Sequence, residues 1–201
     1  MVAIDIQDRL KELYQPTTKD FSLVDVPEMQ FVMIDGKSNP EGPAFLRAVK
    51  WLFTVIFPIK RIAKERMGKH FVEPPLEALW WADDMNDLIT GKKDQLKWRA
   101  MIVLPHWLDE DIFRDAIQLA TQKLGDAPAS LRRESITEGH CVQIMHKGPN
   151  ADLRQIVAKL HQEFLPTHDL VARGHHHEIY LNDSNRVAPE KLKTILRQPV
   201  Q

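Results

Sequence analysis

The 201-residue sequence lacks the features of a secreted or membrane-spanning protein. Its single cysteine, Cys141, cannot form an intramolecular disulfide, which is typical of a reducing compartment. The longest apolar stretch, from Trp51 to Ile59, is much shorter than the roughly 20 residues that a membrane helix needs. The N-terminal residues carry early acids and no apolar core, so we expect no signal peptide. These absences predict a globular protein of the cytoplasm.

The sequence also lacks an excess of charge of either sign. Lys and Arg total 27, Asp and Glu total 28, and the formal net charge is −1. A strong basic excess is typical of general nucleic-acid binders, and residues 1–20 are too few for a helix-turn-helix. We therefore expect no direct binding of nucleic acid. Phosphate-binding loops, dinucleotide-binding fingerprints and serine-nucleophile motifs are absent too, and we expect no cofactor.

Residue periodicity predicts an α+β fold in the first part of the chain. We expect β-rich runs, a helix and two further strands, at residues 21–27, 30–36, 43–67, 76–81 and 96–104. A second helix is predicted from Asp109, a typical N-cap, to Leu124, where Gly125 ends it. The remainder predicts a hairpin, an amphipathic helix and two last strands, at residues 130–137 with 140–146, 153–164, 178–181 and 193–196.

The order strand, strand, helix, strand, strand occurs twice in these assignments. Three pairs of segments match in the same order: 26–37 with 136–147, 76–80 with 177–181, and 98–105 with 193–199. We therefore predict two pseudo-symmetric βαββ repeats with antiparallel sheets, residues 21–105 and 130–201. An N-terminal arm or short helix (1–20) precedes them, and a linker helix (106–129) joins them. Such halves leave a cleft between them that is suited to a ligand.

The segment matches place Glu77 and Glu178 at equivalent strand positions, so we expect both to face this cleft. Side chains alternate along a strand, which puts Glu178 and Tyr180 on one face. A carboxylate in an aromatic-lined pocket attracts cations and can exchange protons near neutral pH. The alternative is a strand glutamate that is solvated or paired with a neighbouring base.

Three consecutive histidines, His175, His176 and His177, precede Glu178. Because successive strand residues point to opposite faces, at most two of these histidines can share a metal ion. Zinc sites recruit further ligands at recognisable spacing, and none is present, so we predict no metal site. His176 is instead expected to support Glu178.

Several segments resemble stand-alone GyrI-like small-molecule-binding proteins. They are Pro75-Leu-Glu-Ala-Leu-Trp80, Lys97-Trp-Arg-Ala-Met-Ile-Val-Leu-Pro105, Glu138-Gly-His-Cys-Val-Gln-Ile-Met-His-Lys-Gly-Pro149, His176-His-Glu-Ile-Tyr-Leu-Asn-Asp183 and Ala188-Pro-Glu-Lys-Leu-Lys-Thr-Ile-Leu-Arg-Gln-Pro199. The resemblance implies a duplicated SHS2-type βαββ fold with the ligand between the halves. It implies that Glu178 lies at the pocket centre and that aromatics at Trp80 and Trp98 help to line it. Met101, Asn150 and His176 complete the predicted ligand-binding set.

The resemblance implies two kinds of activity. Related domains sense effectors in multidrug regulators, whereas some stand-alone members resemble hydrolases that open cyclopropane rings of DNA-alkylating natural products. Those hydrolases use a Tyr directly after Gly-Pro and a Glu shortly beyond it, but this chain has Asn150 and Leu153 at these places. We therefore expect binding of hydrophobic or cationic aromatic compounds, for sequestration or sensing. The alternatives are a hydrolase with Glu178 as its catalytic residue, and a gyrase-inhibitor-like protein-interaction role.

Overall fold

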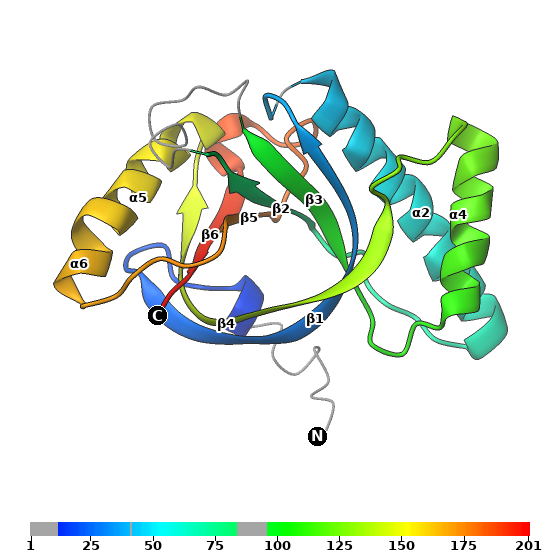
Figure 1. The fold of residues 1–201 in the computed structure, drawn as a ribbon, viewed down its shortest axis with the longest axis horizontal. Coiled ribbons are helices and arrows are strands. Elements are labelled where there is room, and N and C mark those ends of the chain that lie inside the picture. The colour runs from blue at the N-terminus through cyan, green and yellow to red at the C-terminus, as the bar shows by residue number, and fades with distance from the viewer. Residues whose placement is uncertain (1–11, 41, 84–95) are drawn as a thin grey trace.

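The computed structural model describes residues 12–40, 42–83 and 96–201 (Figure 1). Its strands are β1 (Ser22–Lys37), β2 (Leu76–Trp81), β3 (Lys97–Leu104), β4 (Arg132–Lys147), β5 (His176–Tyr180) and β6 (Lys193–Pro199). Its helices are α2 (Pro43–Met67), α4 (Glu110–Leu124), α5 (Leu153–Lys159) and α6 (Leu165–Thr167). A π-helical turn, Leu160–Phe164, joins α5 to α6, and 3-10 turns occupy Asn150–Asp152 and Pro189–Lys191.

The six strands form a closed, barrel-like antiparallel sheet in the order β1-β3-β2-β5-β6-β4. The described elements run β-α-β-β from β1 to β3 and again from β4 to β6, with α4 between the two runs. Helices α2 and α4 cover one side of the sheet, and α5 and α6 cover the opposite side (Figure 1). The strands β2 and β5 are paired, so the two runs meet at that seam.

The first and fourth strands are longer than the sequence predicts. The predicted hairpin at 130–146 is wrong, because β4 is one continuous strand, and the two runs at 21–36 likewise form the single strand β1. The reason is long-range pairing: β1 pairs with β4 from Ser22 to Met33 and with β3 from Gln30 to Lys37. Only Pro27, which has no N–H to donate, interrupts this ladder, and the register is the same on both sides of it.

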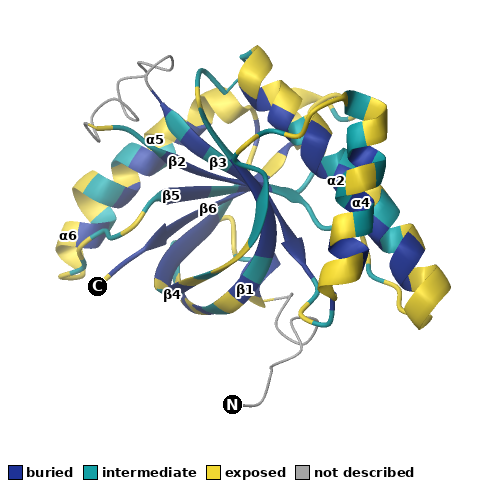
Figure 2. Ribbon diagram, turned by 45° about the vertical axis from the view of Figure 1, so that its right-hand side comes forward, coloured by how far each residue is buried: buried dark blue, intermediate teal, exposed yellow. Residues whose placement is uncertain are grey.

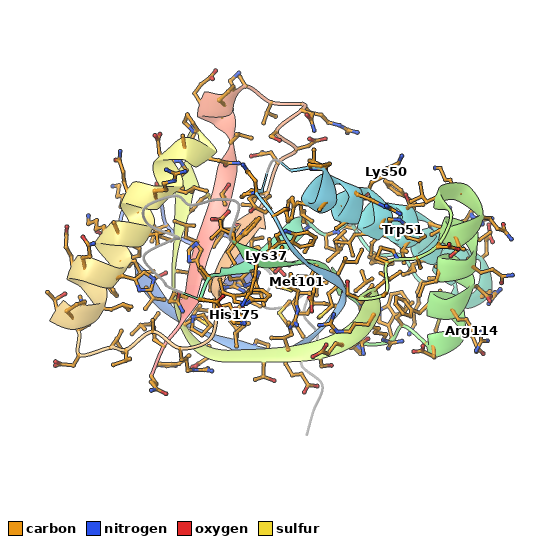
Figure 3. The ribbon with its side chains drawn as sticks, turned by 45° about the horizontal axis from the view of Figure 1, so that its top comes forward. Lys37, Lys50, Trp51, Met101, Arg114 and His175 are labelled. Atoms are coloured by element: carbon orange, nitrogen blue, oxygen red, sulfur yellow. The ribbon has the colours of Figure 1, made fainter. Side chains whose placement is uncertain are left out.

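Helix α2 begins and ends where its sequence directs. Pro43 occupies its first turn, and Gly68 adopts φ 65° and donates its N–H to the last carbonyls. One apolar stripe of α2, which includes Trp51 (Figure 3), packs on the outer face of β1 and β3. Figure 2 shows the strands as the most buried layer, with exposed residues on the outward sides of the helices. As predicted, Asp109 caps α4 by accepting a hydrogen bond from the Ile112 amide at 2.8 Å.

Gly36 on β1 provides space for a tryptophan from β3. A Cβ atom at this position would overlap Cζ2 and Cη2 of the Trp98 ring. We expect Gly36→Ala to lower the free energy of unfolding by about 1–3 kcal/mol, the usual cost of overpacking a core. Urea denaturation measures this change. Adding Trp98→Phe, which shortens the ring, should recover part of the loss, and no recovery would show that the overlap is not the cause.

Candidate ligand-binding cavity

A cavity of about 1100 Å³ lies between α2 and α5, over the outer face of β2, β5 and β6. Both runs of the chain contribute to its lining, together with the loop that follows β5. A volume of this order is large enough to enclose most of a drug-sized molecule. The cavity is therefore the leading candidate site among the described residues.

Helix α2 provides an apolar wall of the cavity. The wall consists of one stripe of side chains, Leu46, Val49, Phe53 and Phe57. Leu46 is 58% exposed and Phe57 is 54% exposed, although both are large and apolar. The rings of Phe53 and Phe57 lie 6.3 Å apart between centroids. Val49 and Phe53 are partly buried against the core, whereas Leu46 and Phe57 leave apolar area that can contact an apolar molecule.

Glu178 lies at the strand side of the cavity and is held by a chain of hydrogen bonds. Tyr180 donates its hydroxyl to Oε2 of Glu178 at 2.6 Å, and Nε1 of Trp80 donates to the Tyr180 oxygen at 3.1 Å. Burial and then the Glu178 carboxylate raise the pKa of Tyr180 well above its ordinary value. The phenol therefore remains protonated and continues to donate to Glu178.

The three consecutive histidines point to three different surroundings. His175 (Figure 3) stacks on Trp81 with ring centroids 4.2 Å apart. His176 lines the cavity, and its Nε2 lies 3.5 Å from Oε1 of Glu178. His177 lies inside the barrel. Strand alternation explains why the second and third histidines separate so completely.

His176 is only 2% exposed, and neither of its ring nitrogens has a hydrogen-bond partner among the described residues. His161, on the π-helical turn, lies close enough to interact with it. Burial, followed by the neighbouring His176, lowers the pKa of His161 below its ordinary value. An unpartnered buried polar group costs about 1–3 kcal/mol, so its presence beside a cavity favours a functional role.

The wall opposite α2 comes from the turn before α5 and from α5 itself. Asn150, Leu153 and Arg154 line the cavity there. Thr194 on β6 donates its hydroxyl to Oδ1 of Asn150 at 3.5 Å. Asp152 points to solvent, so Leu153 faces the cavity without an acidic neighbour in this turn.

The structure brings five of the eight predicted ligand-binding residues to one cavity: Trp80, Asn150, His176, Glu178 and Tyr180. Trp98 lies behind this lining, beneath α2. Its ring packs edge-on against Phe45 at 5.2 Å, and its Nε1 donates to Oγ of Ser38 at 3.1 Å.

The other two predicted residues, Glu77 and Met101, lie on the inner face of the barrel. They are cross-strand partners between β2 and β3. On β5 the inward-facing residue is His177, whereas Glu178 faces the cavity, because side chains alternate along a strand. Glu77 therefore does not share the cavity with Glu178. The segment match aligned Glu77 with a residue of the opposite face, and a shift of one residue in such an alignment exchanges the two faces of a strand.

The barrel interior contains a buried chain of charged groups. Nε2 of His177 lies 2.9 Å from Oε2 of Glu77, and its Nδ1 lies 3.0 Å from Oε1 of Glu138. Nη1 of Arg197 lies 3.3 Å from Oε2 of Glu138. Tyr14, from the N-terminal segment, donates its hydroxyl to Oε1 of Glu77 at 2.7 Å. Each buried charge is therefore paired, as burial in a low-dielectric interior requires.

These contacts raise the pKa of the histidine in the network and lower the pKa of one of its glutamates. Burial alone would lower the pKa of His177, but the carboxylates of Glu138 and Glu77 outweigh it and raise the pKa to about 9. Burial likewise opposes ionisation of Glu138, yet His177 and Arg197 lower the pKa of that carboxyl to about 2. Glu138 and His177 are thus both charged at neutral pH.

The network was missed by sequence reasoning because its members are far apart in the chain. Glu138 and Arg197 are 59 positions apart, and Tyr14 and Glu77 are 63 positions apart. Alternation along β5 is the one local signal, since it separates His177 from the cavity-facing His176 and Glu178.

Metal binding and membrane-spanning helices can be assessed for the described residues 12–40, 42–83 and 96–201. No three His, Cys, Asp or Glu side chains in them are arranged to hold a metal ion. Within the same ranges, no helix combines the length and apolarity that crossing a membrane requires.

The closed antiparallel sheet and the helices around it define a protein of mixed helix and sheet, with a cavity of a size that suits a small molecule. The chain belongs to the GyrI-like family: the family model for the GyrI-like small molecule binding domain matches residues 19–201. The resemblance predicted from the sequence segments is thereby confirmed.

Solved structures of similar proteins agree with this assignment. An uncharacterised conserved protein from Listeria innocua is 36% identical, with a TM-score of 0.86 over 98% of this chain and 100% of that one. A hydrolase from Listeria innocua is 35% identical, with a TM-score of 0.81 over 98% and 100% of the two chains. The EcmrR C-terminal domain shares the fold at 14% identity, with a TM-score of 0.57 over 90% and 97%. No curated protein matches the sequence.

Proposed function

We propose that the protein binds hydrophobic or cationic aromatic small molecules in the cavity between α2 and α5, for sequestration or sensing. We further infer that residues 21–105 and 130–201 act as two equivalent βαββ halves and that the cavity is the cleft between them. The family supports ligand binding in general. The proposal that the ligands are aromatic and cationic rests on one observation. The carboxylate of Glu178 shares the cavity with the aromatic side chains Phe53, Phe57 and Trp80.

The charges around the cavity fit a cationic ligand at the strand side. Glu178 has no Lys or Arg partner among the described residues, and its side chain is 17% exposed. The other acids of the lining are paired: Asp183 with Arg186 at 3.2 Å, and Glu73 with Lys60 at 3.5 Å. Glu178 is therefore available to pair with a cationic ligand, and the aromatic rings offer stacking and cation–π contacts.

Substituting Glu178 tests this role. We expect Glu178→Gln to weaken binding of the aromatic cation acridine orange by about tenfold or more, because a hydrogen bond to a charged group contributes about 1.5–3 kcal/mol. Binding of an uncharged aromatic such as pyrene should change by less than about twofold, since it uses the apolar walls and the transfer of its area from water. Isothermal titration calorimetry measures both.

The matched control is Glu190→Gln, which removes an exposed acid on the Pro189–Lys191 turn outside the cavity. It should leave both affinities unchanged. An equal loss of affinity for cation and neutral compound in Glu178→Gln would contradict a charge-recognition role for Glu178.

The second candidate function is hydrolysis of electrophilic, ring-strained compounds. The hydrolase from Listeria innocua at 35% identity favours it. Glu178 could act as a general base on a water, with Tyr180 holding its carboxylate. Asn150 and Leu153 count against it, because neither supplies the acid or phenol of the resembling hydrolases. Incubation with a cyclopropane-bearing alkylator distinguishes the two functions. More than one water-added product per protein molecule, abolished in Glu178→Gln, would indicate an enzyme. Compound that is bound by the protein and recovered unchanged would indicate binding alone.

A further inference from the structure

The carboxylate of Glu178 has one oxygen already engaged and one available. Oε2 accepts the Tyr180 hydroxyl at 2.6 Å, and Trp80 fixes that hydroxyl from behind at 3.1 Å. Oε1 accepts no hydrogen bond from the described residues. Its polar neighbour is Nε2 of His176, 3.5 Å away on a ring that is almost fully buried. A ligand in the cavity therefore meets an anionic acceptor of fixed orientation.

The surroundings of Oε1 favour a ligand that brings its own hydrogen-bond donor. The wall across the cavity is the apolar stripe of α2, which offers no hydrogen bond. The cationic groups of the described lining do not compensate Glu178, since Arg186 pairs with Asp183 and Arg154 is exposed to solvent. A charge-assisted hydrogen bond in such a partly desolvated place is shorter and stronger than a neutral one.

Building on the proposed binding function, we propose that the cavity selects cations that carry an N–H donor. The ligand class is protonated aromatic amines: the ring system lies along Phe53 and Phe57, and the N–H points to Oε1 of Glu178. A cation without an N–H, such as a quaternary aromatic ammonium, keeps the attraction between charges but forms no hydrogen bond. The inference concerns the choice among cations, which the proposed function leaves open.

Two dyes that differ by one group test this selection. Acridine orange carries an N–H on its ring nitrogen at neutral pH, and its N10-methyl analogue has the same ring system and charge without that N–H. Calorimetry with the 201-residue chain should show binding of acridine orange that is about tenfold tighter or more. The preference should shrink in Glu178→Gln, whose amide oxygen is an uncharged acceptor, and vanish in Glu178→Leu, which has no acceptor. Circular dichroism establishes that both variants fold.

The outcomes separate this inference from the proposed function. Equal binding of the two dyes by the wild-type protein would overturn the selection for N–H donors and leave binding of cations intact. A preference that persists in Glu178→Leu would also overturn it, because the methyl group would then be excluded by shape alone. Binding of neither dye would overturn the proposed function, and this inference with it.

Discussion

Replacing Arg197 with leucine is expected to lower the free energy of unfolding by about 3–5 kcal/mol, the usual cost of breaking a buried ion pair on one side. The Arg197 side chain is 1% exposed and lies 3.3 Å from the Glu138 carboxylate. It also donates to the Leu13 carbonyl at 2.6 Å and to the Gln143 amide oxygen at 3.1 Å. Its removal leaves a buried acid with one fewer cation and frees the N-terminal segment from this contact. Urea denaturation measures the loss.

Two further variants determine whether the loss comes from the buried charge. Arg186→Leu removes an arginine whose side chain is 83% exposed and which pairs with Asp183, so it should cost less than about 1 kcal/mol. The double variant Arg197→Leu with Glu138→Leu should be more stable than Arg197→Leu alone, because it removes the excess negative charge and leaves one acid, Glu77, with one base, His177. A double variant that is less stable than the single one would contradict the charge explanation.

Stability should fall below about pH 4.5 and above about pH 6.5, for two different reasons. The pKa of His177 is raised from 6.5 to about 9, so its contribution is fully present below pH 6.5 and is lost as the pH rises through 9. The pKa of Glu138 is lowered from 4.5 to about 2, so its contribution is present above pH 4.5 and is lost as the pH falls toward 2. Each shift corresponds to about 3 kcal/mol. The two are not added, because both arise largely from the same His177–Glu138 contact.

The imidazole of His177 can be titrated directly. Nuclear magnetic resonance of the side-chain nitrogens should show His177 still protonated at pH 8, when unperturbed imidazoles near pKa 6.5 have lost their proton. Urea unfolding measured from pH 3 to pH 10 should show the highest stability between about pH 4.5 and 6.5, where both contributions are complete. A neutral His177 at pH 7 would contradict the paired arrangement inside the barrel.

Local sequence signals were sufficient for the helices and for the strand at the seam. Helix α2 occupies the predicted residues 43–67, because its apolar positions recur at helical spacing and Gly68 ends it. Strand β2 has the predicted bounds 76–81. The Asp109 cap also forms as expected. These features depend on residues within one or two turns of each other, which is why the sequence alone indicates them.

Features that depend on distant pairing were not predictable in the same way. The turn expected near Pro27 and the hairpin expected near Gly139 are both absorbed into long strands, because β1 and β4 pair with each other along this stretch. Glu77 lies on the inner face of β2 and Glu178 on the outer face of β5, and a match of sequence segments does not determine which face a strand residue occupies. Alternation placed Glu178 and Tyr180 together, and that local rule led to the cavity.

A crystal structure of the protein with acridine orange tests the central claim most directly. We expect the dye between α2 and α5, with its rings against Phe53 and Phe57 and its ring nitrogen within hydrogen-bond distance of Oε1 of Glu178. Density for the dye only outside this cavity, with Glu178 uncontacted, would contradict the account.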